Sequence, residues 1–530
     1  MFSKHSQAYR GLLRELKKSS LPPHKINSAL SSSFRRLAEE AKHSDVILDD
    51  LRNAAVFMAA QREYKVLLDR YNPLVDLTAE ERIHATARRV GLDMPITHEP
   101  ENNKGMIEAQ QPTTMRIFHP TPKQGSRIPT MLSTQVLHCD PASVSFDPST
   151  SQPRITSPDT LNSLSVAAKN LIDLQPVAFP TETVYGLGAL ALNSSAASCI
   201  FAVKGRPPDN PLIVHVSSLD MLYGLLPRSF KMPESYKLLI RRFWPGALTL
   251  LFPSDPNTIP SIITANQPTV AIRMPSHPVA RALIALANAP VAAPSANSSG
   301  KPSPTTAEHV LRDLDGKVSV ILDGGACGVG LESTVVDGLQ PDGKIRVLRP
   351  GGITVEDITK ALEEGIQDPK LVPQVLVHRR DYRDEHLEAA PSTPGMKYRH
   401  YSPTAPVILL MTASPPRENV TPSSAQSFLV RLKDEIQPSS SIKVGLLVLT
   451  DSTLGTLTLP TIDGVEWCRY ELGPVDDPAV TARRLFDGLL SLDQQHVDVI
   501  LIEEVNETNE GLAIMNRVRK AASEVRWITF

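Results

Sequence analysis

The sequence lacks several features that would assign it to a simple class. It has no apolar run of roughly 18–20 residues, so we expect no transmembrane helix and no membrane partner. Its cysteines, Cys139, Cys199, Cys327 and Cys468, lie far apart without a Cys-x-x-Cys pair. That spacing excludes a sequence-local zinc ribbon, gives no sign of a disulfide framework and favours a reducing compartment. The net charge of −2 supplies no global attraction to nucleic acid, so any such binding must be local.

Short motifs for nucleotides and metals are also missing. There is no Gly-x4-Gly-Lys-Ser/Thr loop, no Gly-x-Gly-x-x-Gly that opens a helix, and no His-Glu-x-x-His or acid-box metal site. Gly186 and Gly188 are therefore interpreted as turn glycines rather than as a dinucleotide fingerprint. On this pattern we expect no metal held by protein side chains.

Five segments differ in composition. Residues 1–95 carry apolar positions at helical spacing, which predicts a helical hairpin or bundle. Residues 96–154 are rich in proline and predict a linker, whose last part is an extended lead-in to the next domain. Residues 155–365 and 405–530 each alternate helical and strand patterns, and residues 366–404 form a second linker. We predict the α/β or α+β class, with a central sheet and a smaller C-terminal α/β domain.

Short apolar runs locate the expected strands and amphipathic patterns the expected helices. In the middle domain, strands are expected at Val177–Phe179, Leu212–Val216, Leu248–Phe252, Val270–Arg273, Val291–Ala293, Val318–Leu322 and Thr334–Val336. Helices are expected there at Leu161–Leu174, Leu283–Ala287 and Ala307–Leu314. In the last domain, strands are expected at Val407–Met411, Val444–Thr450 and Val499–Glu503, and helices at Thr481–Leu492 and Gly511–Ala522.

Polar clusters follow several of these runs. They are Pro180–Gly188, Lys204–His215, Thr269–Pro275, Ala293–Ser303 and Glu332–Asp337, with Leu348–Gly352 beyond. Loops at strand ends are where α/β proteins gather ligand-binding groups. These loops supply cations, hydroxyls and glycines, a mixture that suits a nucleotide together with a small carboxylate.

Cations and a histidine are the first candidates for chemistry. Lys204 and Arg206 stand two residues apart before Pro207-Pro208, where they either grip phosphates or form a solvated pair in a turn. Arg273 ends an apolar run, so it needs a partner, which is either a carboxylate ligand or an internal Asp or Glu. His215 ends another buried run and is either a core residue or a ligand contact.

Hydroxyls and amides in tight loops form a second group of candidates, because they can satisfy phosphate and ribose oxygens. As bare patterns they are also ordinary polar turns. They are Asn210, Ser295, Asn297, Ser298, Ser303, Ser333 and Thr334, with Arg349 before Pro-Gly-Gly.

Taken together and in this order, the clusters over about residues 150–355 resemble the YrdC-like domain of L-threonylcarbamoyladenylate synthases. The resemblance includes a lysine-x-arginine signature, Lys204-Gly-Arg206, and a serine-x-asparagine signature, Ser295-Ala-Asn297. Pro391–Pro403 resembles the linker of the two-domain form, and 405–530 its smaller C-terminal, Rossmann-like α/β domain. Leu190 departs from the pattern, since the family usually has an acid there.

The resemblance implies a nucleotidyltransferase with a twisted-sheet catalytic domain. L-threonine, bicarbonate and ATP, with Mg²⁺, would give threonylcarbamoyl-adenylate and pyrophosphate. The product would pass to the tRNA-modifying threonylcarbamoyl transferase complex that makes N6-threonylcarbamoyladenosine. A direct contact with tRNA or double-stranded RNA is a further expectation, and the linker at Pro391–Pro403 is expected to act as a lid that excludes water.

It also implies a role for each matching residue. Lys204 and Arg206 would be catalytic, and Lys204 would lie between the two ligands. The residues implied to hold L-threonine are Thr183, His215, Arg273, Ser333 and the backbone near Ala293. The residues implied to hold ATP are Arg206, Asn210, Thr269, Ser295, Ser303 and Arg349.

The first segment resembles a different family. Tyr9–Arg14, Phe34-Arg35 and Ala87–Pro95 resemble the small LYR-type helical assembly factors of mitochondria, in particular one that assists ATP-synthase assembly. An unrelated helical hairpin is the alternative. The chain is then either a natural fusion or a merged gene model, with Met115 or Met131 as the start of the enzyme.

Other functions and locations stay open at this point. An RNA-binding module without catalysis and an assembly factor carried by residues 1–95 are the alternative functions. A carbamoyl transferase of the hydrogenase-maturation type would add Cys-x-x-Cys zinc motifs, which are not seen. We expect a cytoplasmic protein. The basic stretch Met1–Lys18, as a transit peptide rather than a first helix, would add a mitochondrial pool.

Overall fold

The computed structural model describes residues 133–382, 384, 400–416, 421–436 and 441–530. The predicted helical segment 1–95, the linker up to residue 132 and most of the stretch 391–403 lie outside these ranges. Within the described ranges, no helix is both long enough and apolar enough to cross a membrane.

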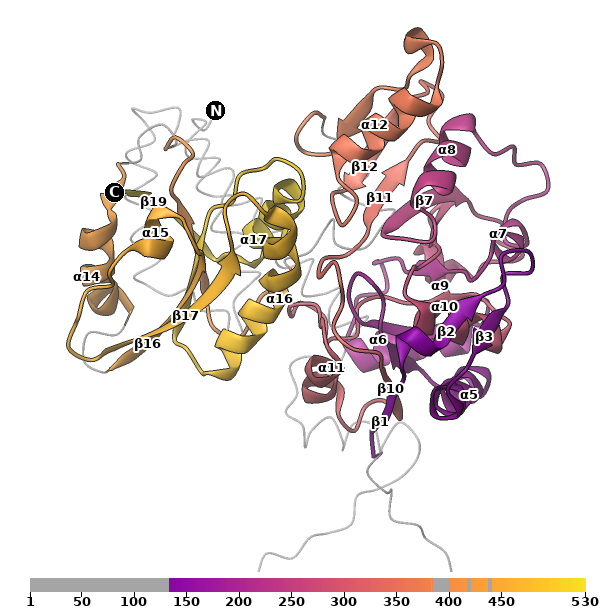
Figure 1. The fold of residues 1–530 in the computed structure, drawn as a ribbon, viewed down its shortest axis with the longest axis horizontal. Helices are drawn as coiled ribbons and strands as arrows, with labels where there is room; N and C mark the ends of the chain where they lie inside the picture. The colour runs from indigo at the N-terminus through magenta and orange to yellow at the C-terminus, as the bar shows by residue number, and fades with distance from the viewer. Residues whose placement is uncertain (1–132, 383, 385–399, 417–420, 437–440) are drawn as a thin grey trace, which may run out of the picture. The chain divides into compact units, whose positions relative to one another are not determined.

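An eleven-stranded mixed sheet forms the centre of the first described domain (Figure 1). Its order is β1-β10-β4-β5-β9-β6-β8-β7-β11-β12-β13. The strands are β1 Gln135–His138, β4 Val177–Phe179, β5 Gly186–Leu190, β6 Ile213–His215, β7 Leu248–Pro253, β8 Thr269–Arg273, β9 Val291–Ala292, β10 Val320–Asp323, β11 Thr334–Asp337, β12 Ile345–Arg349 and β13 Val375–Val377. The sheet contains parallel pairs, such as β6 with β8, and antiparallel pairs, such as β4 with β5. The predicted mixed class with a central sheet is confirmed.

Helices cover both faces of this sheet (Figure 1). They are α5 Pro158–Ile172, α6 Ser194–Lys204, α7 Leu219–Tyr223, α8 Glu234–Phe243, α9 Ser261–Thr264, α10 Pro278–Ala287, α11 Ala307–Leu314 and α12 Val355–Gly365. The short elements are β2 Val144–Phe146, β3 Pro153–Ile155, η1 Pro141–Ser143 and η2 Pro369–Leu371. Val177 and Phe179 pack with α5 and α10, whereas Ala178 between them joins the cluster of α6 and α8. The alternation along β4 therefore divides the core into two layers.

The two predicted linkers contribute strands to the sheet. β1 comes from the stretch 96–154 and pairs in parallel with β10 at one edge. β13 comes from the stretch 366–404 and pairs in parallel with β12 at the other edge. The expected extended lead-in thus takes its hydrogen bonds from the sheet, which accounts for its order despite few apolar residues.

Two glycines that the sequence suggested were turn residues lie in a strand instead. Gly186 and Gly188 belong to β5. A Cβ on Gly188 would lie 2.5 Å from the Phe179 ring and 2.7 Å from Val291. The interpretation as turn glycines is wrong, because here glycine makes room for a buried aromatic ring rather than for an unusual backbone angle.

The second domain is a doubly wound, all-parallel sheet of six strands (Figure 1). Its order is β15-β19-β14-β18-β16-β17. The strands are β14 Val407–Met411, β15 Ser423–Ser424, β16 Ile442–Leu449, β17 Val465–Gly473, β18 Val499–Glu503 and β19 Glu524–Thr529. The helices are α14 Ala425–Ile436, α15 Thr453–Thr456, α16 Pro478–Gln494 and α17 Gly511–Ala521. α14 packs on one face of the sheet, and α16 with α17 on the other.

The second domain packs against the site loops of the first, and both belong to one compact unit, 124–530. Val184 and Leu331 of the first domain are buried in the cluster that contains α16 and α17. Gly330, at φ +77°, lies so close to α16 that a Cβ there would be 2.4 Å from the Arg483 Cα. Glycine is therefore required at residue 330 for two reasons, its backbone angle and the approach of another backbone.

This contact predicts unequal costs for two otherwise identical substitutions. Gly330→Ala meets both the left-handed backbone and the Arg483 backbone, whereas Gly343, at φ +68°, has no atom within 4 Å of such a Cβ. We expect Gly343→Ala to lower the free energy of unfolding by about 1–2 kcal/mol, and Gly330→Ala to lower it by clearly more. Urea unfolding of both variants measures the difference, and equal losses would contradict the close approach.

Candidate active site

A single cavity collects the polar residues at the ends of these strands. Together with the part that is open to solvent, it encloses about 710 Å³ of space between atoms. The side chains come from the β4–β5 loop, the end of α6, β6, β8, the loop after β9, the loop before β11, and β12. They include Thr183, Lys204, Arg206, His215, Arg273, Ala293, Ser295, Asn297, Ser303, Glu332, Ser333 and Arg349.

The structure brings together all the residues with an implied role except Asn210 and Thr269, and the further candidates Ser298 and Thr334 do not line the cavity either. Asn210 is buried beside the cavity, where its carbonyl oxygen accepts a hydrogen bond from Arg206 Nε at 3.1 Å. Thr269 begins β8, at the opposite end of that strand from Arg273. Its buried hydroxyl has no hydrogen-bond partner within the described part of the chain.

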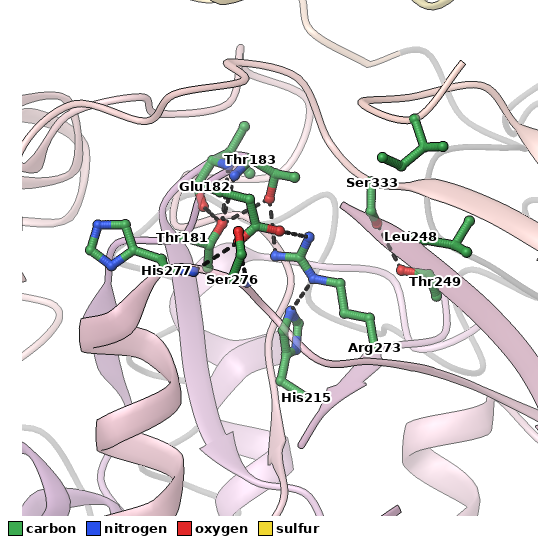
Figure 2. Close-up of polar contacts among 12 residues, drawn as sticks. Thr181, Glu182, Thr183, His215, Leu248, Thr249, Arg273, Ser276, His277 and Ser333 are labelled. Carbon is green, nitrogen blue, oxygen red and sulfur yellow. Dashed lines mark hydrogen bonds and ion pairs between the residues drawn. The ribbon is translucent and has the colours of Figure 1, made fainter. Parts of the chain in front are cut away.

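Arg273 is the centre of a hydrogen-bond network in the cavity wall (Figure 2). Its Nε donates to His215 Nε2, one terminal nitrogen to Glu182 Oε1 and the other to Thr183 Oγ1, each at 3.0 Å. The sequence left the partner of Arg273 open between a ligand and an internal acid, and the structure supplies the internal acid, Glu182. Glu182 also accepts backbone hydrogen bonds from Ser276 and His277, which hold it in place.

The contacts of His215 determine its protonation. Because Nε2 accepts from Arg273, the proton of the neutral ring lies on Nδ1 and is donated to the Ile213 carbonyl at 3.1 Å. Burial, followed by the nearby Arg273 charge, holds the pKa of His215 well below its usual value. His215 is thus neutral and orients the guanidinium instead of competing with it for an anion.

Lys204 connects the two signature motifs. It is the last residue of α6, and the C-cap residue that follows, Gly205, adopts the left-handed conformation. Its buried Nζ donates to the carbonyl oxygens of Ser295 and Asn297. Burial, and next the charge of Arg206, lower the pKa of Lys204 well below its usual value. The lysine-x-arginine turn and the serine-x-asparagine loop therefore form one physical unit.

Two arginines complete the cationic wall. Arg206 donates to the carbonyl oxygens of Asn210 and Pro211, and Arg349 donates to the Ser333 carbonyl at 2.9 Å. Burial is the main reason that the pKa of Arg206 falls to about 9 and that of Arg349 to about 10. Carbonyl oxygens satisfy the donors without removing the charge, so both side chains stay cationic near neutral pH.

The cavity therefore carries an excess of positive charge. Five basic side chains line it, Lys204, Arg206, Arg273, Lys301 and Arg349. Arg273 and Lys301 pair with Glu182 and Asp313, which lie outside the lining. Among the lining residues that the structure describes, the only carboxylate is Glu332. A site of buried, closely spaced basic groups favours a polyanionic ligand.

Several lining residues were not among the predicted site residues. Glu332 lies inside one of the polar clusters but had no assigned role. The same holds for Glu182, which does not line the cavity but accepts a hydrogen bond from Arg273. His400 and Tyr401 come from the described end of the linker motif and also line the cavity. Burial, and after it the charge of Arg206, lower the pKa of His400 to about 4. Its neutral ring closes one side of the cavity without adding charge.

Three family models match the chain. One, described as "Telomere recombination", matches residues 171–351. A second, described as "Threonylcarbamoyl-AMP synthase, C-terminal domain", matches residues 353–523. A third, described as "Complex1_LYR-like", matches residues 6–93, which lie outside the described part of the structure.

Similar proteins carry a consistent name. A threonylcarbamoyl-AMP synthase of Schizosaccharomyces pombe is 44% identical over 389 residues, covering 69% of this chain and 90% of that protein. One of Bacillus subtilis is 44% identical over 361 residues, covering 68% of this chain and 92% of that protein. The crystal structure of Pyrococcus abyssi Sua5 complexed with L-threonine aligns with a TM-score of 0.58 at 37% identity, covering 75% of this chain and 100% of that one.

The neutral state of His215 predicts how stability depends on pH. Below about pH 6.5 the unfolded chain takes up a proton at this residue, whereas the folded chain does not. Stability should therefore fall with decreasing pH, and His215→Gln, which keeps an acceptor for Arg273, should reduce the slope by up to about 1.4 kcal/mol per pH unit. Urea unfolding at about pH 7 and about pH 5.5 tests this, and an unchanged slope would show that His215 is protonated in the folded protein.

Proposed function

Because the chain belongs to the threonylcarbamoyl-AMP synthase family, we propose that this cavity converts L-threonine, bicarbonate and ATP into threonylcarbamoyl-AMP and pyrophosphate. The family makes the intermediate of threonylcarbamoyladenosine formation in tRNA, and the chain is an enzyme of the nucleotidyltransferase type. The observation that carries the proposal is the cavity itself, with its five basic side chains and, among the described lining residues, a single carboxylate.

The reaction needs such a cavity because its two reactants repel each other. The amine of threonine and bicarbonate give a carbamate with loss of water, and a carbamate oxygen then attacks the α-phosphorus of ATP as pyrophosphate leaves. Two like unit charges at about 4 Å cost about 4 kcal/mol at an effective dielectric constant of about 20. Fixed cations offset this repulsion and stabilise the charge that develops on the leaving pyrophosphate.

We assign the threonine end of the cavity to Arg273 and the residues around it. A guanidinium has five N–H groups, and three of them are used by His215, Glu182 and Thr183. One N–H on each terminal nitrogen is left for the threonine carboxylate, the bidentate arrangement that arginine forms best. Ser333 and the backbone near Ala293 supply further polar groups at this end of the cavity.

The nucleotide end is assigned to the carbonyl-held cations. Arg206 and Arg349 are fixed by backbone oxygens, so they need no rearrangement when phosphate charge arrives. Ser295 and Ser303 lie in the loop to whose carbonyl oxygens Lys204 donates hydrogen bonds. We propose that Lys204, which donates to the Ser295 and Asn297 carbonyls, lies where carbamate and α-phosphate would meet.

ATP is proposed to bind as its Mg²⁺ complex, with the ion on phosphate oxygens. No cluster of metal-ligating side chains occurs in the described residues. Glu332 is the only lining carboxylate among them, and its two oxygens accept hydrogen bonds from Ser303 and Arg517. The donor set of the cavity thus fits an ion that is held by the substrate and water and that offsets phosphate charge.

The product is sensitive to water and has to be passed on to a second enzyme. Threonylcarbamoyl-AMP is a mixed anhydride that water destroys, so His400 and Tyr401 at the cavity wall would help to exclude water. We propose that the product passes to the tRNA-modifying threonylcarbamoyl transferase complex.

Pyrophosphate release by the full chain tests the reaction. With ATP and Mg²⁺, we expect pyrophosphate only when L-threonine and bicarbonate are both present, and no release after EDTA until Mg²⁺ is restored. An RNA-binding protein without catalysis would release none under any of these conditions. Release that is independent of threonine would contradict the assignment of the carboxylate end.

Removal of either signature cation tests the nucleotide end. Lys204→Ala and Arg206→Ala should each lower kcat/KM by at least about 100-fold, because each deletes a preorganised charge that the transition state uses. Lys237→Ala, at an exposed lysine of α8, is the matched control and should keep wild-type activity. Circular dichroism checks that the fold is retained, and turnover near the control level in either variant would count against the assignment.

A further inference from the structure

Arg517 belongs to α17 of the C-terminal domain, yet its guanidinium contacts Glu332, which lines the catalytic cavity. It is fully buried, with 0% of its surface exposed. Its Nε donates to Glu332 Oε2 at 3.0 Å, and a terminal nitrogen lies 3.0 Å from the same oxygen. The other terminal nitrogen donates to the Pro350 carbonyl, next to Arg349. One side chain thus joins α17 to two separate segments of the cavity wall.

Glu332, which Arg517 holds, also contacts Ser303. The Ser303 hydroxyl donates to Glu332 Oε1 at 2.6 Å, and both residues line the cavity. A hydroxyl has one proton, so a serine that donates to a carboxylate presents only lone pairs to anything else. Ser303 can therefore accept a hydrogen bond from a ligand but cannot donate one.

Buried groups of this kind depend on each other. A carboxylate without a partner would be costly in this position, and removing one partner of a buried pair leaves the other charge uncompensated. Burial favours the neutral form of Glu332, but Arg517 and then Arg349 outweigh it and hold the pKa of Glu332 below its usual value. The other titratable groups that act on Glu332 or respond to it are Lys204, His400, Tyr401 and Lys520.

Resting on the function proposed above, we propose that Arg517 is a positioning residue of the ATP subsite: it fixes Glu332, which fixes Ser303 as a hydrogen-bond acceptor for the nucleotide. Phosphate oxygens carry no proton to donate, so Ser303 recognises a donor group of ATP, a ribose hydroxyl or the adenine amino group. The C-terminal domain thereby completes the site for one substrate without touching that substrate.

Kinetics of Arg517→Met in the full chain test this role. The variant keeps the volume of the side chain and removes its charge, and we expect the KM for ATP to rise about tenfold, equal to about 1.4 kcal/mol, with a much smaller change in the KM for threonine. Arg519→Met is the matched control: Arg519 is on the same helix but pairs with Glu507 at the surface, so its KM values should stay at wild type.

The pH profile separates positioning from a merely structural role. Without Arg517 the pKa of Glu332 rises, and a protonated Glu332 no longer requires the Ser303 proton. The acid limb of kcat/KM for ATP should therefore move to higher pH in Arg517→Met. This acid limb should be absent from the double variant Glu332→Gln/Arg517→Met, which has no carboxylate at residue 332 to titrate.

The double variant also keeps the test decisive if Arg517→Met fails to fold, because it leaves no unpaired buried charge. Its rise in KM for ATP should not exceed the larger of the rises caused by Arg517→Met and by Glu332→Gln alone, since the two substitutions act through one contact. Multiplied effects in the double variant, or an unchanged KM for ATP in Arg517→Met, would overturn the proposal. Lack of threonine-dependent pyrophosphate release by the wild-type chain would instead overturn the proposed function.

Discussion

Backbone carbonyl oxygens that hold buried cations are the interaction on which the site depends. Lys204, Arg206 and Arg349 each donate to main-chain oxygens. A carboxylate partner would cancel the charge, whereas a carbonyl only satisfies the donor, so the cavity keeps the field that an anionic substrate needs. Arg273 is the exception, and its acid Glu182 leaves a guanidinium oriented for one carboxylate rather than a free positive charge.

The parts of the fold that were predictable are those with a local signal. β4, β14 and β18 lie at the predicted residues, because each is a short apolar run with turn residues at its ends. β1 and β13 were assigned to linkers, since edge strands of three or four residues have no periodicity of their own. They are ordered by pairing with β10 and β12, and a single sequence does not show that pairing.

The site, like the fold, has residues that the sequence predicts and residues that it does not. The order of the polar clusters was enough to bring Lys204, Arg273 and Ser295 to one cavity. The partners of these residues were not predictable, because Glu182 and Glu332 are ordinary acids in the sequence and acquire their roles only through tertiary contacts. Asn210 and Thr269, expected at the nucleotide, do not line the cavity, and their assignment stays a prediction.

The contact between Gly330 and Arg483 bears on how substrates come and go. The backbones of the two domains are in close contact there, and the buried Arg517 belongs to the same interface. Separating the domains would therefore expose a buried charge and break close packing. Substrates would then enter the cavity, and products leave it, while the two domains stay together.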